Sequence, residues 1–202
     1  MKNKTLLMTI AILFVALSSV AQETGTFTDS RDGKVYKTVT IGTQTWMAEN
    51  LAYKADNGCW AYNNDQSNVA TYGYLYDWKT AKTVCPSGWH LPSDAEWKTL
   101  RNKYGRYNLE YIAGGVLKAT SNWSSPNTDA TNSSGFTALP GGYRYITGNK
   151  FEYIGEKAYW WSSTEYNSRF AWYTYIVYNS GAVYQSFVFS NMSGFSVRCI
   201  KD

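Results

Sequence analysis

Residues 84–97, VCPSGWHLPSDAEW, combine a cysteine, a turn and the start of a helix. Ser93 has the residue type and spacing of a helix N-cap: its hydroxyl can accept a hydrogen bond from the backbone N–H of Glu96, while the Glu96 side chain reaches back to Ser93. Pro92 holds the chain extended on the way in. Three apolar side chains follow on one face at helical spacing: Trp97, Leu100 and Tyr104. The stretch therefore predicts a helix that begins after Ser93 and ends near residue 104.

The chain has three cysteines, Cys59, Cys85 and Cys199, which allow at most one intramolecular disulfide. Our first hypothesis pairs Cys85 with Cys199, because this bond would tie the first helix to the last strand. By closing a long loop, this bond would stabilise the folded protein by about 4–5 kcal/mol in the chain-entropy model. Cys59 would then remain, either as a buried thiol or as an intermolecular or reactive one.

The first 21 residues have the organisation of a secretory signal peptide. Residues 1–4 are basic, residues 6–17 are apolar, and residues 18–21 are small enough for a signal peptidase. We predict cleavage after Ala21. Since no cysteine follows the apolar run, a lipid anchor is disfavoured, and no second run is long enough to span a membrane. The mature protein is therefore expected to be secreted, or to lie at the cell surface or in the periplasm.

Composition indicates one domain that binds neither nucleic acid nor an anionic membrane. Removing residues 1–21 lowers the formal charge from +4 to +2, and no basic run is present. We place a short N-terminal lead at residues 22–28 and a single domain at residues 29–202. The 9 Trp, 18 Tyr and 8 Phe, punctuated by Gly, Ser and Asn, favour a loop-rich β or α+β domain over a helical bundle.

Alternation of apolar and polar residues predicts strands in the first and last parts of the chain. Residues 34–41 and 44–48 form the arms of a hairpin around Gly42-Thr43. Four further strand-like runs are 159–163, 170–178, 182–189 and 195–200, and residues 179–181 make a hairpin turn. Residues 53–73 and 120–135 are predicted to be polar loops, and a short helix ends at Lys82. Trp160 and Trp161 are predicted to lie in the core.

Six blocks in the same order resemble the Fibrobacter succinogenes major paralogous domain. They are DSRDGKVY (29–36), IGTQTWMAENL (41–51), YGYLY (72–76), CPSGWHLP (85–92), WWSST (160–164) and VRC (197–199). The resemblance covers residues 29–202. It implies an exported bacterial protein of a family whose biochemical role is largely unassigned.

Residues 90–97 and 194–199 are also similar, more distantly, to two blocks of the formylglycine-generating, sulfatase-modifying family. This similarity implies an α+β, C-type-lectin-like fold with a twisted antiparallel sheet, two short helices and long loops. It also implies a bond between a cysteine near the first helices and one in the last strand, in agreement with Cys85–Cys199. In the diversified lectin-like receptors that some members resemble, the segment after a WWSST block contacts ligand.

The sequence argues against an enzyme. The sulfatase-modifying enzymes bind copper through a cysteine pair near their closing strand, but residues 169–198 contain no cysteine. His90 is the only histidine, and we interpret it as packed or hydrogen-bonded rather than catalytic. One histidine and no cysteine cluster leave no zinc site, so we expect no metal and no cofactor. A structural calcium ion held by Asp65 and Asp129 is kept as an alternative.

Binding has the better case, because the hairpin at residues 164–190 is aromatic on both alternating faces. One face must pack on the core, and the other would leave Tyr rings, or their alternates, in reach of a ligand. The competing interpretation is that both faces are covered. The predicted ligand site comprises Trp123, Asn167, Arg169, Tyr173, Tyr175 and Tyr184.

We therefore predict a non-catalytic binding module for an extracellular glycan or a protein surface. Two alternatives stay open: a structural or assembly subunit of a cell-surface appendage, and a divergent enzyme on the sulfatase-modifying scaffold. The sequence leaves the oligomeric state undecided.

Overall fold

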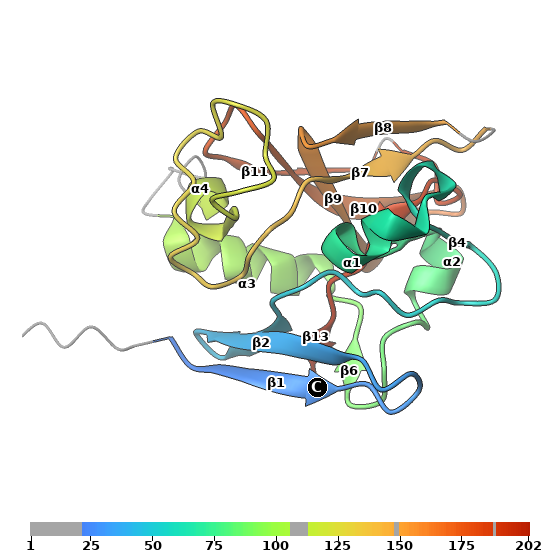
Figure 1. The fold of residues 1–202 in the computed structure, drawn as a ribbon, viewed down its shortest axis with the longest axis horizontal. Coiled ribbons are helices and arrows are strands. Elements are labelled where there is room, and N and C mark those ends of the chain that lie inside the picture. The colour runs from blue at the N-terminus through green and yellow to red at the C-terminus, as the bar shows by residue number, and fades with distance from the viewer. Residues whose placement is uncertain (1–21, 106–112, 148–149, 188) are drawn as a thin grey trace, which may run out of the picture.

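Two β-sheets dominate the computed structural model, which describes residues 22–105, 113–147, 150–187 and 189–202 (Figure 1). In chain order the strands are β1 (Thr24–Thr28), β2 (Val35–Ile41), β3 (Gln44–Met47), β4 (Cys59–Trp60), β5 (Leu75–Tyr76), β6 (Trp89–His90), β7 (Gly141–Arg144), β8 (Phe151–Ile154), β9 (Lys157–Asn167), β10 (Phe170–Val177), β11 (Val183–Ser186), β12 (Phe195–Ser196) and β13 (Ile200–Lys201). The helices are α1 (Val69–Tyr72), α2 (Trp78–Ala81), α3 (Asp94–Tyr104) and α4 (Ala113–Leu117), with 3₁₀ turns η1 (Tyr62–Asn64) and η2 (Gln66–Asn68). The fold is mixed α and β, with more sheet than helix.

The first sheet has the order β1-β2-β3-β13-β6. The predicted hairpin is confirmed: β2 and β3 pair antiparallel from Thr38↔Met47 to Ile41↔Gln44. Gly42, in the turn, has a φ of 65°, a conformation that glycine adopts without strain. The predicted N-terminal lead at residues 22–28 contains strand β1, which pairs antiparallel with β2 along its whole length.

The second sheet has the order β11-β10-β9-β12-β5-β4, with β7 paired to β9 and β8 paired to β7. Three of the predicted late strands are confirmed as β9, β10 and β11, and the β10–β11 hairpin turns through residues 178–182. The predicted strand at 195–200 is wrong as a single element, because it is divided into β12 and β13, which lie in different sheets. β8 was not predicted. It is short and half-exposed, and Tyr153 within it has a φ of 66°, so its sequence shows no clear alternation.

The helix after Ser93 is confirmed together with its cap. Ser93 Oγ accepts from the Glu96 N–H at 3.3 Å, and Glu96 Oε2 accepts from the Ser93 N–H at 2.7 Å. The short helix α2 is also confirmed. The expected two helices are too few, because α1 and α4 add two more among the described residues, and the 53–73 loop contains β4, η1, η2 and α1. These elements are too short to leave a hydrophobic period in the sequence.

The core consists of two aromatic clusters, one on each side of β9. Trp161 belongs to the first and lies 4.2 Å, centroid to centroid, from Phe195. Trp160 belongs to the second, with Trp97 and Phe136. Both Trp160 and Trp161 are fully buried, as predicted. Successive residues of β9 therefore point to opposite faces and fill both clusters.

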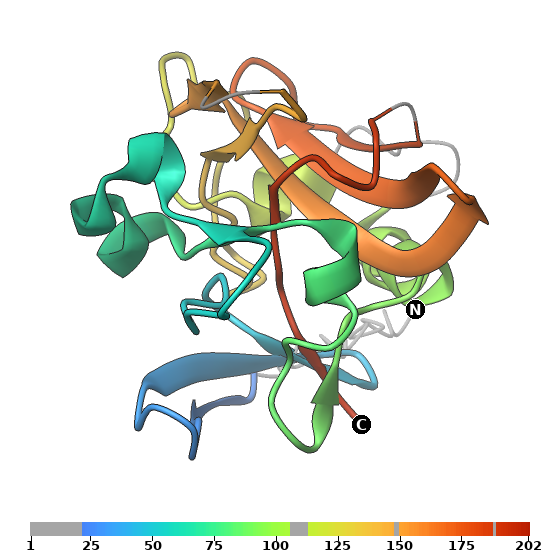
Figure 2. The ribbon, with the colours of Figure 1, turned by 90° about the vertical axis from the view of Figure 1, so that its right-hand side faces the viewer.

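The last segment of the chain connects the two sheets. β12 lies in the second sheet and β13 in the first, and Figure 2 shows the dark red segment running from one to the other. The Cys85–Cys199 disulfide is confirmed and fastens this segment to the residues before β6, with a Cα–Cα distance of 6.0 Å. A disulfide is typical of proteins outside the cytoplasm.

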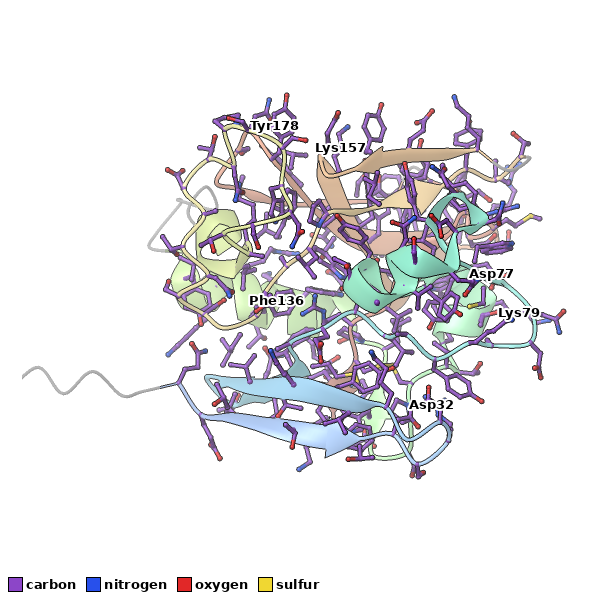
Figure 3. The ribbon with its side chains drawn as sticks, viewed as in Figure 1. Asp32, Asp77, Lys79, Phe136, Lys157 and Tyr178 are labelled. Carbon is purple, nitrogen blue, oxygen red and sulfur yellow. A yellow bond between two sulfur atoms is a disulfide. The ribbon has the colours of Figure 1, made fainter. Side chains whose placement is uncertain are left out.

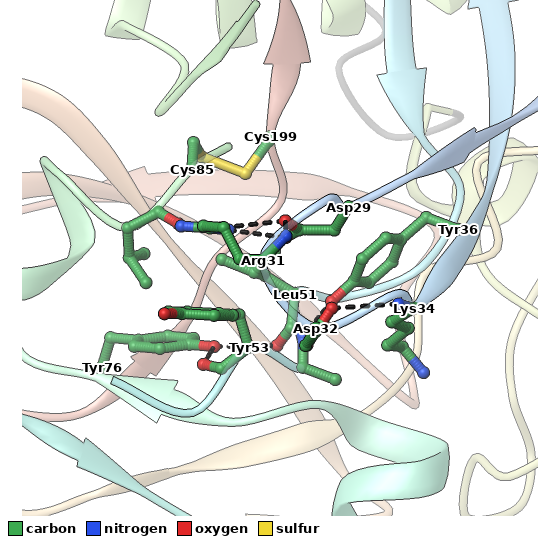
Figure 4. Close-up of polar contacts among 12 residues, drawn as sticks. Asp29, Arg31, Asp32, Lys34, Tyr36, Leu51, Tyr53, Tyr76, Cys85 and Cys199 are labelled. Carbon is green, nitrogen blue, oxygen red and sulfur yellow. Dashed lines mark hydrogen bonds and ion pairs between the residues drawn. A yellow bond between two sulfur atoms is a disulfide. The ribbon is translucent and has the colours of Figure 1, made fainter. Parts of the chain in front are cut away.

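A partly buried ion pair lies beside the disulfide (Figure 4). Arg31 Nη2 donates to Asp29 Oδ2 at 2.6 Å, and Arg31 Nη1 donates to the carbonyl of Val84, the residue before Cys85. Asp29 is fully buried. The turn before β2 is thus fixed to the same point of the structure as the disulfide.

Candidate functional site

The candidate site is the hairpin of β9 and β10, whose tip is residues 167–170. Asn167 and Arg169 are both exposed there. Asn167 Oδ1 accepts hydrogen bonds from the backbone N–H groups of Arg169 at 3.0 Å and Phe170 at 3.1 Å. Asn167 therefore shapes the tip with its carbonyl oxygen. Its amide group and the Arg169 side chain belong to the surface of the hairpin.

One face of the hairpin is covered by the core. Tyr173 is only 3% exposed, and its ring contacts Trp161 and Phe195. The prediction that Tyr173 is in reach of solvent is therefore wrong. The physical reason is that β12 brings Phe195 across this face, so Tyr173 has no open side.

Tyr175 and Tyr184 continue the same face and are half-buried. Their rings are stacked with centroids 4.9 Å apart. Tyr175 also packs against the first core cluster, and the Tyr184 hydroxyl lies 2.9 Å from Ser180 Oγ. Both side chains therefore have part of their surface near solvent and part engaged within the protein.

The opposite face carries three aromatic rings that belong to neither core cluster. Tyr166 from β9 stacks on Phe187 after β11, with centroids 3.8 Å apart and an angle of 12° between the rings. Trp172 from β10 packs edge-on against both, at 5.7 Å and 4.9 Å. Tyr166 is 47% exposed, and the other two are half-buried. We name Tyr166, Trp172 and Phe187 the aromatic platform.

The sequence-based prediction of the ligand site did not include the three platform residues, although the sequence contained a signal for them. Trp172 and Phe187 alternate with Tyr173 and with the other rings chosen from the sequence. Assigning the correct face needed the position of Phe195, which comes from a strand far along the chain. Sequence alternation alone shows that two faces exist, but not which of them the core covers.

Trp123 lies far from the tip. Its Nε1 donates to the Ala138 carbonyl at 2.9 Å, and its ring packs against the second core cluster. Its loop is fixed to the turn between β10 and β11, where the Thr128 N–H donates to the Tyr178 carbonyl at 2.8 Å. β10 is long enough to separate this turn from the tip by roughly 23 Å. The structure therefore does not bring Trp123 together with Asn167 and Arg169.

Lys118 connects the 120–135 loop to the turn between β10 and β11. Its ammonium lies 3.1–3.4 Å from the carbonyl oxygens of Val177, Tyr178 and Ser180, and 5.5 Å from the centroid of Trp123. Burial lowers the pKa of Lys118 to about 8. Figure 3 shows Tyr178 near the edge of the molecule, above α4. This end of the sheet is a structural anchor for the 120–135 loop.

His90 lies between two carboxylates. Its Nδ1 is 2.6 Å from Asp202 Oδ1, and its Nε2 is 2.8 Å from Glu96 Oε1. Burial lowers the pKa of His90, but the hydrogen bonds to Glu96 and Asp202 and their charges outweigh it, so the pKa is raised overall. The prediction of a hydrogen-bonded histidine is confirmed. Both ring nitrogens are occupied, and each faces a different carboxylate.

The other residues that the sequence suggested for a reactive or metal-binding role do not form a common site. Burial raises the pKa of the Cys59 thiol to about 11, so the thiol stays protonated at neutral pH. Asp65 Oδ1 accepts from the Ser67 N–H at the start of η2, while Asp129 belongs to the 120–135 loop. In the part of the chain that the structure describes, no three His, Cys, Asp or Glu side chains are grouped to hold a metal ion.

Comparison with known proteins identifies the family. The model of the Fibrobacter succinogenes major domain matches residues 39–201. The chain belongs to this family. No curated protein and no solved structure matches the chain. In the Fibrobacter succinogenes major domain of this protein, the matched region includes the whole β9–β10 hairpin and both cysteines of the disulfide.

Family membership assigns no activity, so function has to be argued from the geometry. The comparisons show no relation to the sulfatase-modifying family. None of the helices among the described residues has the length and apolar character needed to cross a membrane.

Proposed function

We propose that this protein is an exported, non-catalytic binding module that recognises an extracellular glycan through the aromatic platform. The observation that carries the proposal is that Tyr166, Trp172 and Phe187 pack on one another and not on the core. The apolar surface of these rings that remains in contact with water is unfavourable in free energy compared with the same surface buried in the core. A ligand that covers them recovers this free energy.

The chemistry of the platform suits sugars. Aromatic rings stack on the apolar faces of sugars, and rigid Tyr and Trp side chains lose little entropy when they bind. The Tyr166–Phe187 stack and the edge-on Trp172 hold each other in place before binding. The exposed Arg169 and Asn167 at the adjoining tip supply hydrogen-bond donors for hydroxyl groups.

We also propose that the fold is C-type-lectin-like. The antiparallel late strands, the α3 helix and the bond between Cys85 near this helix and Cys199 before the last strand support this assignment. In this proposal the aromatic platform lies on the part of the fold that follows the WWSST block at residues 160–164.

The proposed role is non-catalytic, and the surroundings of two titratable side chains support this part of the proposal. His90 has both ring nitrogens held by Glu96 and Asp202, so neither nitrogen is available as a base for a nucleophile. The Cys59 thiol, with its raised pKa, is a poor nucleophile.

A second candidate function, an assembly subunit, is favoured by the edge strand β1. Among the described residues β1 pairs on one side only, with β2, and most of its residues are exposed. It contains neither Lys nor Pro, the residues that commonly protect an edge from pairing with another chain. Strand exchange at β1 would appear as oligomers in size-exclusion chromatography of the mature protein. A monomer at all concentrations would contradict this candidate.

A glycan array and a pull-down with the mature protein test the proposed function. We expect binding by the wild type and its loss in the Trp172→Ala variant. Tyr145→Ala is a matched control, because Tyr145 is an exposed aromatic residue outside the platform. Capture of a protein in place of a glycan, with the same dependence on Trp172, would move the proposal to a protein ligand. No binding to either, or equal binding by Trp172→Ala, would overturn it.

A further inference from the structure

A cavity of about 130 Å³ with both polar and apolar lining lies between the β2–β3 hairpin and α1, apart from the aromatic platform. It shares no residue with the platform, so the inference stands apart from the proposed function. Its wall includes apolar side chains, among them Ala48 and Leu139, and its polar residues include Asn50 and Thr137. The volume is below that of a site for a drug-sized ligand, so it suits a small molecule or one end of a larger one.

Two lysines give the cavity positive charge. Lys34 and Lys37 both line it, and no ion pair joins either ammonium to a carboxylate in the described parts of the chain. Glu49 also lines the cavity, but its Oε2 accepts from the backbone N–H of Lys37 at 2.8 Å. Figure 4 shows the Lys34 side chain extending beyond Tyr36, away from the disulfide.

A third cation lies directly behind the cavity wall. The Arg198 side chain is fully buried, and its Nε and Nη2 donate to Asn50 Oδ1 at 3.2 Å and 2.8 Å. Its remaining bonds go to the carbonyls of Met47, Phe136 and Thr137, so every acceptor is neutral. A buried charge that no carboxylate contacts is costly, even though the Glu49 carboxylate attracts it from farther away. An anion on the far side of Asn50 and Thr137 would offset part of that cost.

The backbone at the cavity is strained. Thr137 has a φ of 54°, which is unfavourable for a β-branched residue. Its N–H donates to Asn132 Oδ1 at 2.9 Å, and its carbonyl accepts from Arg198 Nη2 at 3.3 Å. Strain of this kind is retained where the surroundings over-determine it, and it occurs preferentially at ligand sites.

We propose that this cavity binds a small organic acid in its carboxylate form. The three cations and the single carboxylate around it leave a positive site that attracts an anion. The apolar wall favours a ligand with a carbon skeleton over inorganic phosphate, and Glu49 at the rim disfavours a second negative charge. The carboxylate is expected to approach Lys34 and Lys37, with the skeleton against Leu139.

A titration followed by NMR tests the proposal with glucuronic acid, which differs from glucose in carrying a carboxylate. We expect glucuronate to shift the amide signals of Asn50 and Thr137, and glucose to leave them unchanged. The Lys34→Gln/Lys37→Gln variant should bind about tenfold more weakly, because it removes both ammonium groups that attract the carboxylate. The control is Lys79→Gln/Lys98→Gln, which removes the same charge elsewhere; Figure 3 shows Lys79 pointing away from the fold.

Three outcomes would overturn the proposal: no shift with glucuronate, an equal shift with glucose, or equal weakening in the control variant. Binding of inorganic phosphate as strong as that of glucuronate would reject a carboxylate ligand. Trp172→Ala should bind glucuronate like the wild type. This result separates a failure of the cavity proposal from a failure of the platform.

Discussion

Two regions of this protein place their side chains for opposite purposes. In the frame, defined as the Cys85–Cys199 disulfide, the Arg198 network and the capped start of α3, most of the polar atoms of each side chain are bonded within the protein. In the aromatic platform, the rings of Tyr166, Trp172 and Phe187 pack on one another at the surface and belong to neither core cluster. The comparison teaches that burial, and not aromatic content, separates structural from candidate binding residues here.

The disulfide should have the largest effect on stability. We expect the Cys85→Ala/Cys199→Ala variant to lose about 4–5 kcal/mol of unfolding free energy, because the bond closes a long loop in the unfolded chain. Urea denaturation measures the loss. Cys59→Ala removes the half-buried free thiol and is expected to lose far less. Equal losses in the two variants would show that the frame does not depend on the bond.

The Arg198 network comes next. Asn50 Oδ1 accepts from Arg198 twice and from Trp160 Nε1 at 2.9 Å. Asn50→Ala leaves these buried donors unsatisfied, so we expect a loss of roughly 2–3 kcal/mol in chemical denaturation. The control is Asn57→Ala, at an exposed asparagine, with roughly 0.5 kcal/mol or less. A similar small loss for Asn50→Ala would remove the network from the frame.

The cap of α3 should have a smaller effect. Ser93→Ala removes the acceptor for the Glu96 N–H, and we expect a loss of about 1 kcal/mol, measured by thermal or urea unfolding. Ser93→Asp keeps an acceptor at the same position and should recover most of the stability. Failure of Ser93→Asp to do so would mean that the hydroxyl acts through its other bond, to Glu96 Oε2.

His90 should make stability depend on pH, with the smallest effect of the four. Its pKa is raised in the folded protein, so the stabilisation is complete below the usual histidine pKa of about 6.5 and is lost as the pH rises through the higher folded value. The stability difference between wild type and His90→Gln should therefore shrink from pH 5 to pH 9. A constant difference would contradict the charged contact with Glu96 and Asp202.

Local patterns in the sequence predicted the α3 cap, the first hairpin and part of the core, but not the Arg198 network. The cap of α3, the β2–β3 hairpin and the core position of Trp160 and Trp161 all follow from short-range spacing. The Cys85–Cys199 bond was favoured by chain position and by family resemblance, and the structure confirms it.

The candidate site was harder to predict, because its faces are set by distant segments. Tyr173 is covered by Phe195 from β12, and Trp123 is held away from the hairpin tip by the anchor at Lys118. Neither contact lies within one strand or helix, so no local period of the sequence reports it. Strand β1 was missed for the same reason, since its strand character depends on pairing with β2.

Ligand binding by two variants, one in the platform and one in the frame, tests the central claim most directly. Trp172→Ala changes the platform and Ser93→Ala changes the frame; each is placed on the glycan array beside the wild type, and its urea midpoint is measured. We predict that Trp172→Ala loses binding with little change in midpoint, while Ser93→Ala keeps binding with a lower midpoint. Retained binding in Trp172→Ala, or loss of binding in both variants while they remain folded, would contradict the division between frame and platform.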